Sequence, residues 1–227
     1  MPKLLSRLPF GAFLAYSPNG PANEEPHRSS QRLRRAIKAD GIYLGAPAID
    51  LAVRRLVEEA PAEILSILHD AVLVPAPRSA PFPEGLEIPL RGTARDFLWV
   101  PRRICQKLVE ARLAAGWAPI LVRRFKVAKS AGAARGDRPL PAAHAESMAV
   151  VAQATAARRF VIVDDVVTRG ATLLACASLL EQRYTGADIS GFALLRTVSN
   201  PNEFSNILEP VTGSIELRPT GDTIRRP

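Results

Sequence analysis

Apolar residues in the first 70 positions recur mostly at helical spacing. The pattern predicts three helices, over residues 31–38, over residues 48–60 and in a shorter segment that begins after Pro61. Ser29 and Ser30 precede the first of these helices, where a side-chain oxygen can cap the free N–H groups. One continuous apolar run, Phe10–Tyr16, stands among proline, glycine and asparagine residues and predicts an edge strand. We expect residues 1–70 to form a small hood or cap segment.

From residue 71 onward, short apolar runs alternate with amphipathic segments. The runs, which predict strands, are Ala71–Val74, Pro119–Val122, Phe160–Val163 and Ile189–Leu195. Two segments with helical spacing, Trp99–Ala115 and Ala171–Tyr184, lie among them. Such alternation is typical of an α/β domain with a central parallel sheet flanked by helices, and we assign this core domain to residues 71–227. We expect the tail beyond Asn200 to be irregular.

A long basic stretch, residues 123–143, shows no apolar period and predicts a functional or disordered loop. Its six cations are Arg123, Arg124, Lys126, Lys129, Arg135 and Arg138. Each could reach a ligand when the loop closes, Lys129 first among them by position, or belong to a solvated run of charge. His144 follows the loop, and we expect a surface or capping residue there, with acid–base chemistry as the alternative.

Composition places the chain among ordinary globular proteins, with 227 residues of which 47% are hydrophobic and 23% charged. Neither a membrane-spanning run nor a signal-peptide pattern occurs, so we expect a cytoplasmic protein. The two cysteines, Cys105 and Cys176, form neither a disulfide framework nor a zinc site. A net charge of +8 suits a polyanionic small ligand, a nucleic acid or a basic solvated surface.

The most informative segment runs from Phe160 to Leu174. Four apolar residues are followed by Asp164 and Asp165, which places two carboxylates at the carboxyl end of a strand, where parallel α/β proteins bind ligands. A loop of small and hydroxyl residues then opens a helix, and it comprises Thr168, Arg169, Gly170, Ala171 and Thr172. Its backbone N–H groups and the helix dipole favour an anion. Together these features predict a ribose-phosphate site.

Other proteins also place paired aspartates after an apolar strand. Metal sites of nucleotidases, acidic pockets of response regulators and solvated strand ends all do so. The chain has no Gly-x-x-x-x-Gly-Lys-Ser/Thr sequence, which argues against a P-loop nucleotidase. The acid pair followed directly by the threonine and glycine loop is more specific than either half alone.

Phe160–Leu174 resembles the phosphoribosyl-pyrophosphate signature of type I phosphoribosyltransferases. The similarity extends from about Ala71 to Arg196, and it is strongest to the competence-protein-F-like members. They share a Val-Pro-x-Pro strand end, here Val74–Pro77, a basic loop, and the sequence Val-Asp-Asp-Val-Val-Thr-x-Gly-Ala-Thr. Many of them begin with a Cys-x-x-Cys zinc ribbon, which this chain lacks.

The resemblance implies an enzyme that uses 5-phosphoribosyl-1-pyrophosphate and Mg²⁺ and transfers phosphoribose to a base or amine with release of pyrophosphate. Asp164 and Asp165 would hold the ribose hydroxyls, directly or through Mg²⁺, and Thr168–Thr172 would hold the 5-phosphate. Arg78 and Ser79 would contact the pyrophosphate, and Lys129 would close over it. Dimers are common in the family, so a homodimer is expected.

The sequence leaves open which acceptor the protein uses and whether it is an enzyme. The family's 6-oxopurine enzymes have an aspartate where this chain has Thr168, which argues against hypoxanthine or guanine as acceptor. Because one fold serves many roles, two further interpretations stand beside the enzyme. One is a non-catalytic sensor of phosphoribosyl pyrophosphate or a nucleotide that binds nucleic acid, and the other is a scaffold that binds neither.

Overall fold

The computed structural model describes residues 2–21, 23–82, 98–127, 139–151 and 157–227. Its helices are α1 (His27–Lys38), α2 (Ala48–Glu59), α3 (Ala62–Leu68), α4 (Val100–Glu110), α5 (Pro141–Glu146) and α6 (Ala171–Arg183). The N-terminal half contains strands β1 (Arg7–Tyr16), β2 (Ile42–Tyr43), β3 (Ala46–Pro47), β4 (Val72–Pro75) and β5 (Gly116–Trp117). They are followed by β6 (Leu121–Arg123), β7 (Met148–Val150), β8 (Arg159–Val167), β9 (Asp188–Thr197), β10 (Leu208–Leu217) and β11 (Thr223–Arg226).

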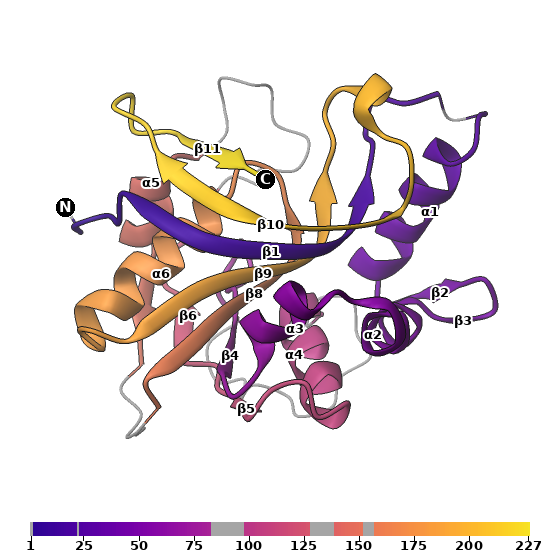
Figure 1. The fold of residues 1–227 in the computed structure, drawn as a ribbon. Coiled ribbons are helices and arrows are strands. Elements are labelled where there is room, and N and C mark those ends of the chain that lie inside the picture. Colours follow the sequence, from indigo (N-terminus) through magenta and orange to yellow (C-terminus); the bar gives the residue numbers. More distant parts are fainter. Residues whose placement is uncertain (1, 22, 83–97, 128–138, 152–156) are drawn as a thin grey trace.

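A twisted central sheet organises the described part of the chain (Figure 1). Its seven strands lie in the order β11-β10-β1-β9-β8-β4-β5. The strands β1, β9, β8, β4 and β5 run parallel, while β10 runs antiparallel to both β1 and β11. The predicted α/β class with a mostly parallel sheet flanked by helices is confirmed.

The first strand lies inside the sheet, so the prediction of an edge strand was wrong. Proline cannot donate to a ladder and is found in sheets mostly at edges or strand ends, and Pro9 lies near the start of β1. In the structure Pro9 pairs only with Ser214 of β10, and pairing of β1 with β9 begins one residue later, at Phe10. The proline thus precedes the part of β1 that has neighbours on both sides.

Helices cover both faces of the sheet and separate the core into two layers (Figure 1). On one face α1, α2, α3 and α4 pack against side chains that include Val161 and Val163 of β8. On the other face α6 and α5, with the small sheet of β6 and β7, pack against Phe160 and Ile162. The alternation along β8 therefore places successive apolar side chains in opposite layers.

Residues 1–70 contribute β1 and three helices to this common core, and the boundary proposed at residue 70 stays a prediction. Helix α1 begins earlier than expected, so Ser29 and Ser30 lie inside its first turn and do not cap it. The Ser30 hydroxyl instead donates to the His27 carbonyl at 2.8 Å. The same oxygen accepts a bond from the Ser17 amide at 3.3 Å, which ties the helix to the end of β1.

The tail beyond Asn200 is ordered, contrary to the prediction. It forms a short 3₁₀ helix, Pro201–Glu203, and then the hairpin of β10 and β11 at one edge of the sheet. Strand β10 was missed because few of its side chains are buried, so its apolar pattern is weak. The expected strand at Pro119–Val122 also differs, since β6 pairs with β7 outside the central sheet and β5 takes the edge position.

Cys105 in α4 and Cys176 in α6 are buried and form no disulfide, and the Cys176 thiol lies 3.8 Å from the Met148 sulfur. Within the described ranges, no helix combines the length and apolar character needed to cross a bilayer.

Candidate functional site

Strand β8 carries the two carboxylates to the carboxyl edge of the parallel strands. Phe160–Val163 are fully buried and anchor the strand between β9 and β4. The strand continues past this anchor through Asp164 and Asp165, which are only partly buried. Because side chains alternate along a strand, the two acids leave β8 on opposite faces.

Asp165 faces helix α1. Its Oδ2 lies 2.7 Å from Nζ of Lys38, in the last turn of that helix. The other oxygen, Oδ1, accepts a bond from the Val166 amide at 2.8 Å. Both oxygens are therefore engaged in the structure. Lys38 was missed by sequence reasoning, because 127 residues separate it from its partner and nothing local marks it.

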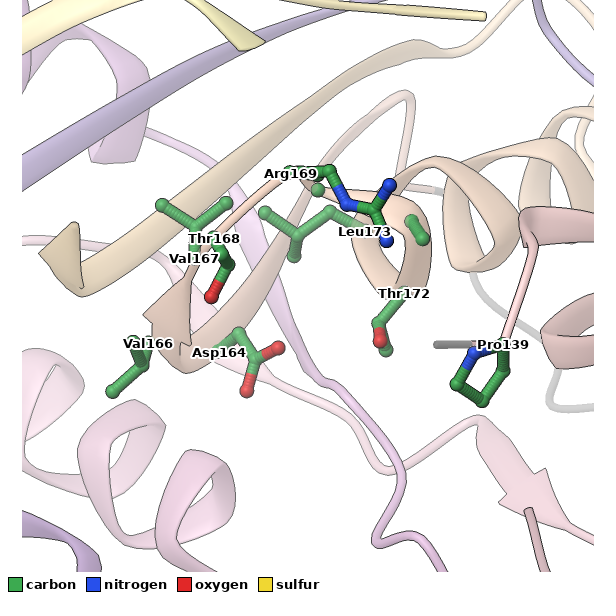
Figure 2. A pocket seen from close by; sticks show the side chains of 10 residues that line it. Pro139, Asp164, Val166, Val167, Thr168, Arg169, Thr172 and Leu173 are labelled. Atoms are coloured by element: carbon green, nitrogen blue, oxygen red, sulfur yellow. The ribbon is translucent and has the colours of Figure 1, made fainter. Parts of the chain in front are cut away.

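Asp164 faces a pocket at the start of α6 (Figure 2). The pocket is also lined by Pro139, Val166, Val167, Thr168, Arg169, Gly170, Ala171, Thr172 and Leu173. Oδ1 of Asp164 accepts the Asp165 amide at 2.8 Å. Burial, and then the neighbouring Asp165 carboxylate, raise the pKa of Asp164 to about 8, against an opposing effect of Lys38. A cation bound beside it would favour the ionised form.

The loop between β8 and α6 depends on Gly170. This residue has φ of +88°, a left-handed conformation that glycine adopts without a steric penalty. A Cβ at this position would lie 2.5 Å from Cδ1 of Ile215, so the loop also needs the space that glycine leaves. The Oγ1 atoms of Thr168 and Thr197 lie 3.2 Å apart, which links the loop to the end of β9.

The first turn of α6 presents free backbone donors to the pocket. No side chain caps this N-terminus, and the first intrahelical bond runs from the Leu174 amide to the Gly170 carbonyl at 2.9 Å. The preceding amides of Ala171, Thr172 and Leu173 lack such partners by helix geometry. Figure 2 shows the Asp164 carboxylate and the Thr172 side chain on the same side of this turn. The arrangement suits an anion attached to a hydroxyl-bearing group.

The guanidinium of Arg169 forms an ion pair with Asp222, in the turn between β10 and β11. Arg169 lines the pocket, but its charge is thus balanced by a carboxylate. From the adjacent β11, Arg225 donates to the carbonyls of Val167 at 3.1 Å and Thr197 at 2.7 Å. Sequence reasoning missed Arg225, because the segment that carries it gave no pattern.

Arg78 and Ser79 follow β4, the strand next to β8, but neither lines the pocket beside Asp164. The Arg78 guanidinium lies over the Phe82 ring, 4.9 Å from its centroid, and its Nη1 is buried without a hydrogen-bond partner in the described residues. The Ser79 carbonyl accepts the Val127 amide at 2.9 Å. This loop leaves the sheet at the same edge as the acid pair, because the two strands are parallel.

Arg123 was counted among the loop cations, yet it is buried at the end of β6. Its Nε donates to the Arg78 carbonyl at 2.8 Å, and its Nη1 donates to the Ser147 hydroxyl at 2.5 Å. It therefore fixes the loop after β4. Lys129, Arg135 and Arg138 lie outside the described residues, so the prediction for Lys129 stays a prediction.

His144 is buried, with 4% of its surface exposed, so the expectation of a surface residue was wrong. Both ring nitrogens lack hydrogen-bond partners in the described part of the chain. Burial, and then the charge of Arg123, lower the pKa of His144 to about 4. The histidine is therefore neutral at physiological pH, and it belongs to α5, the helix that contacts α6.

The residues present offer magnesium one carboxyl group, that of Asp164, which lines the pocket. Mg²⁺ prefers oxygen ligands, keeps several waters and is held by one or two carboxylates plus substrate phosphates. Asp164 offers such a ligand in the pocket, whereas Asp165 is engaged by Lys38. No cluster of three or more histidine, cysteine or acidic residues that could hold a metal occurs in the ranges the structure describes.

Compared with known protein families and with curated proteins, the chain shows no significant match to any. The interpretation of the site therefore depends on its own geometry.

Proposed function

We propose that the chain is a magnesium-dependent phosphoribosyltransferase of the type I class, with residues 1–70 as its hood. It would bind 5-phosphoribosyl-1-pyrophosphate at the carboxyl end of β8 and transfer phosphoribose to a base or amine. The bond between ribose C1 and the pyrophosphate oxygen breaks, and pyrophosphate leaves with that electron pair. The acceptor nitrogen then bonds to C1 and loses a proton to solvent.

One observation carries the proposal. The carboxylate of Asp164 and the uncapped first turn of α6 line the same pocket. A sugar phosphate needs both features, because its hydroxyls donate to a carboxylate while its phosphate accepts from N–H groups. A nucleotidase of the P-loop class would instead need a lysine in its phosphate loop, and Thr168–Thr172 contains none.

The 5-phosphate would be held by the amides of the α6 first turn and by the hydroxyls of Thr168 and Thr172. Because Gly170 has no side chain, the loop packs directly against Ile215 of β10. Asp164 would accept from the ribose hydroxyls. In the transition state C1 gains positive charge, and a nearby carboxylate stabilises it electrostatically.

The leaving pyrophosphate would take its charge balance from the loop after β4. Arg78 has a buried Nη1 without a hydrogen-bond partner among the described residues, and this donor would serve the anion. Arg123 holds the carbonyl of that residue and so fixes where the loop begins. Mg²⁺, when bound to Asp164 and the substrate, would neutralise charge that develops on the leaving group. Asp165 would join the site only if it exchanged Lys38 for another partner.

A panel of bases and amines tests the activity, with release of pyrophosphate from phosphoribosyl pyrophosphate and Mg²⁺ as the readout. We expect turnover with at least one acceptor and a loss of about 100-fold or more in Asp164→Asn, the size of effect that follows when one electrostatic stabiliser of a transition state is removed. Asp188→Asn is the matched control, because Asp188 begins β9 and is largely exposed. Absence of pyrophosphate release with every acceptor would remove the enzymatic proposal.

A second function is favoured by the basic surface of α1. Its exposed arginines, Arg28, Arg32 and Arg35, lie at i, i+4 and i+7 and therefore share a helix face. Arg28 is paired with Glu25, and α1 itself contains no acidic residue. Such a face could contact nucleic-acid phosphates in a sensor that binds phosphoribosyl pyrophosphate without turnover. Affinity for DNA or RNA that falls steeply with salt in wild type, but not in Arg32→Gln/Arg35→Gln, would support this role.

A further inference from the structure

The hairpin of β10 and β11 contacts the Thr168–Thr172 loop and the residue before it in three places. Ile215 of β10 packs against Gly170, and Asp222 in the turn pairs with Arg169. Arg225 of β11 donates one bond to the Val167 carbonyl and another to the Thr197 carbonyl. Val167 immediately precedes the loop, and Thr197 ends β9. Arg225 therefore joins the ends of the two strands from which the site is built.

The arginines near the carboxyl ends of β8 and β9 differ in how their charge is balanced. Arg169 pairs with Asp222, and Arg196 of β9 pairs with Glu209 at 2.6 Å. Arg225 has two carbonyls as hydrogen-bond partners and lies over the Phe10 ring, 6.0 Å from its centroid, but among the described residues it has no carboxylate within ion-pair distance. Carbonyl dipoles satisfy its hydrogen-bond donors but leave its net charge uncompensated.

The charge of Arg225 is also poorly solvated. Burial, and then repulsion from Arg196, lower the pKa of Arg225 to about 10. The side chain remains a cation at neutral pH, but burying its charge costs free energy. An anion bound at the neighbouring loop would offset that cost, because a charge pair interacts more strongly where solvent is excluded.

We propose that Arg225 is a positioning residue whose uncompensated charge favours a dianionic phosphate monoester at the Thr168–Thr172 loop. This inference rests on the proposed function and deepens it. Arg225 would act through the Val167 carbonyl and through the field of its charge, without touching the ligand. The site would therefore select phosphate monoesters, which carry about −1.5 to −2 charges at pH 7, over monoanionic diesters.

Calorimetric titration with ribose 5-phosphate at pH 7 and low salt tests the inference. Arg225→Lys keeps the charge, whereas Arg225→Gln keeps a donor but removes the charge. Arg226→Gln is the matched control, because Arg226 is the next residue of β11, is largely exposed and pairs with Glu216. Melting temperature reports the structural cost of each variant separately from its affinity for the ligand.

We expect Arg225→Gln to weaken binding by about tenfold, Arg225→Lys by less than about threefold, and Arg226→Gln to leave it unchanged. Equal losses in the lysine and glutamine variants would overturn the role of charge and leave a purely structural residue. If Arg225→Gln does not fold, the lysine variant decides, and a loss of about tenfold there overturns the proposal. Absence of binding in wild type would overturn this inference and the proposed function together, whereas binding unaffected in every variant would overturn the inference alone.

Discussion

Replacing Gly170 by alanine places a methyl group where the structure leaves no room for one. The residue has φ of +88°, and an L side chain in a left-handed conformation costs about 1–2 kcal/mol. The new Cβ would also lie 2.5, 2.7 and 2.8 Å from Cδ1, Cγ1 and Cγ2 of Ile215. Ile215 is fully buried, so its branched side chain cannot turn away, and overpacking of this kind costs about 1–3 kcal/mol.

The two effects together predict a loss of about 2–5 kcal/mol in the free energy of unfolding of Gly170→Ala. This is a large part of the total of about 5–15 kcal/mol that is typical of a domain. At about 2–4 °C per kcal/mol for a chain of this size, the melting temperature should fall by about 10 °C. Urea unfolding followed by circular dichroism measures the free energy directly.

Gly186 provides the matched control, because it also has a left-handed φ, of +77°, but a Cβ there would meet nothing within 4 Å. Gly186→Ala should therefore lose only the conformational part, about 1–2 kcal/mol. Adding Ile215→Ala to Gly170→Ala should cost less than the sum of the single changes, since it removes the collision. Equal losses at the two glycines, with additive effects of Ile215→Ala, would refute the argument from close packing.

Three further outcomes follow from the contacts around the site. The pKa of His144 is lowered to about 4 in the folded state, so between pH 6.5 and 4 the unfolded chain binds more protons than the folded one. The free energy of unfolding should therefore fall by about 3 kcal/mol as the pH drops through that range. His144→Met should lack this part of the pH dependence in urea unfolding, and identical profiles would contradict it. A double-mutant cycle of Lys38→Met and Asp165→Asn should give a coupling of about 1 kcal/mol in unfolding free energy, and a coupling near zero would contradict a formed ion pair. Arg123→Met should lower stability by about 2–4 kcal/mol, because the Ser147 hydroxyl and the Arg78 carbonyl lose their buried donor, and a loss comparable to that of the exposed Arg124→Met would contradict this.

The sequence was sufficient for features that lie within one continuous segment. Phe160–Val163, the acid pair and the loop to α6 are adjacent in the chain, so their apolar run and small residues predict a strand, its edge and a helix start. The same holds for helices α2 and α4, whose apolar positions recur at helical spacing. Their placement on the sheet follows from general rules of α/β packing.

Features that depend on distant residues could not be predicted. Lys38 meets Asp165, and Arg225 meets the end of β8, only because the sheet order brings their strands and helices together. Strand β10 gives a weak apolar pattern because few of its side chains are buried, although its backbone pairs with β1 along much of its length. The burial of His144 and Arg123 likewise arises from packing between segments.

The central claim is that Asp164 and the first turn of α6 bind a phosphoribosyl group. Thermal melts of wild type, Asp164→Asn/Asp165→Asn and the control Asp188→Asn, each with and without phosphoribosyl pyrophosphate and Mg²⁺, test it most directly. A ligand at about 100 times its dissociation constant stabilises the folded state by about 2.7 kcal/mol, or about 5–10 °C for this chain length. We predict this rise in wild type and in Asp188→Asn but not in the double variant, and the absence of any shift in folded wild type would contradict the claim.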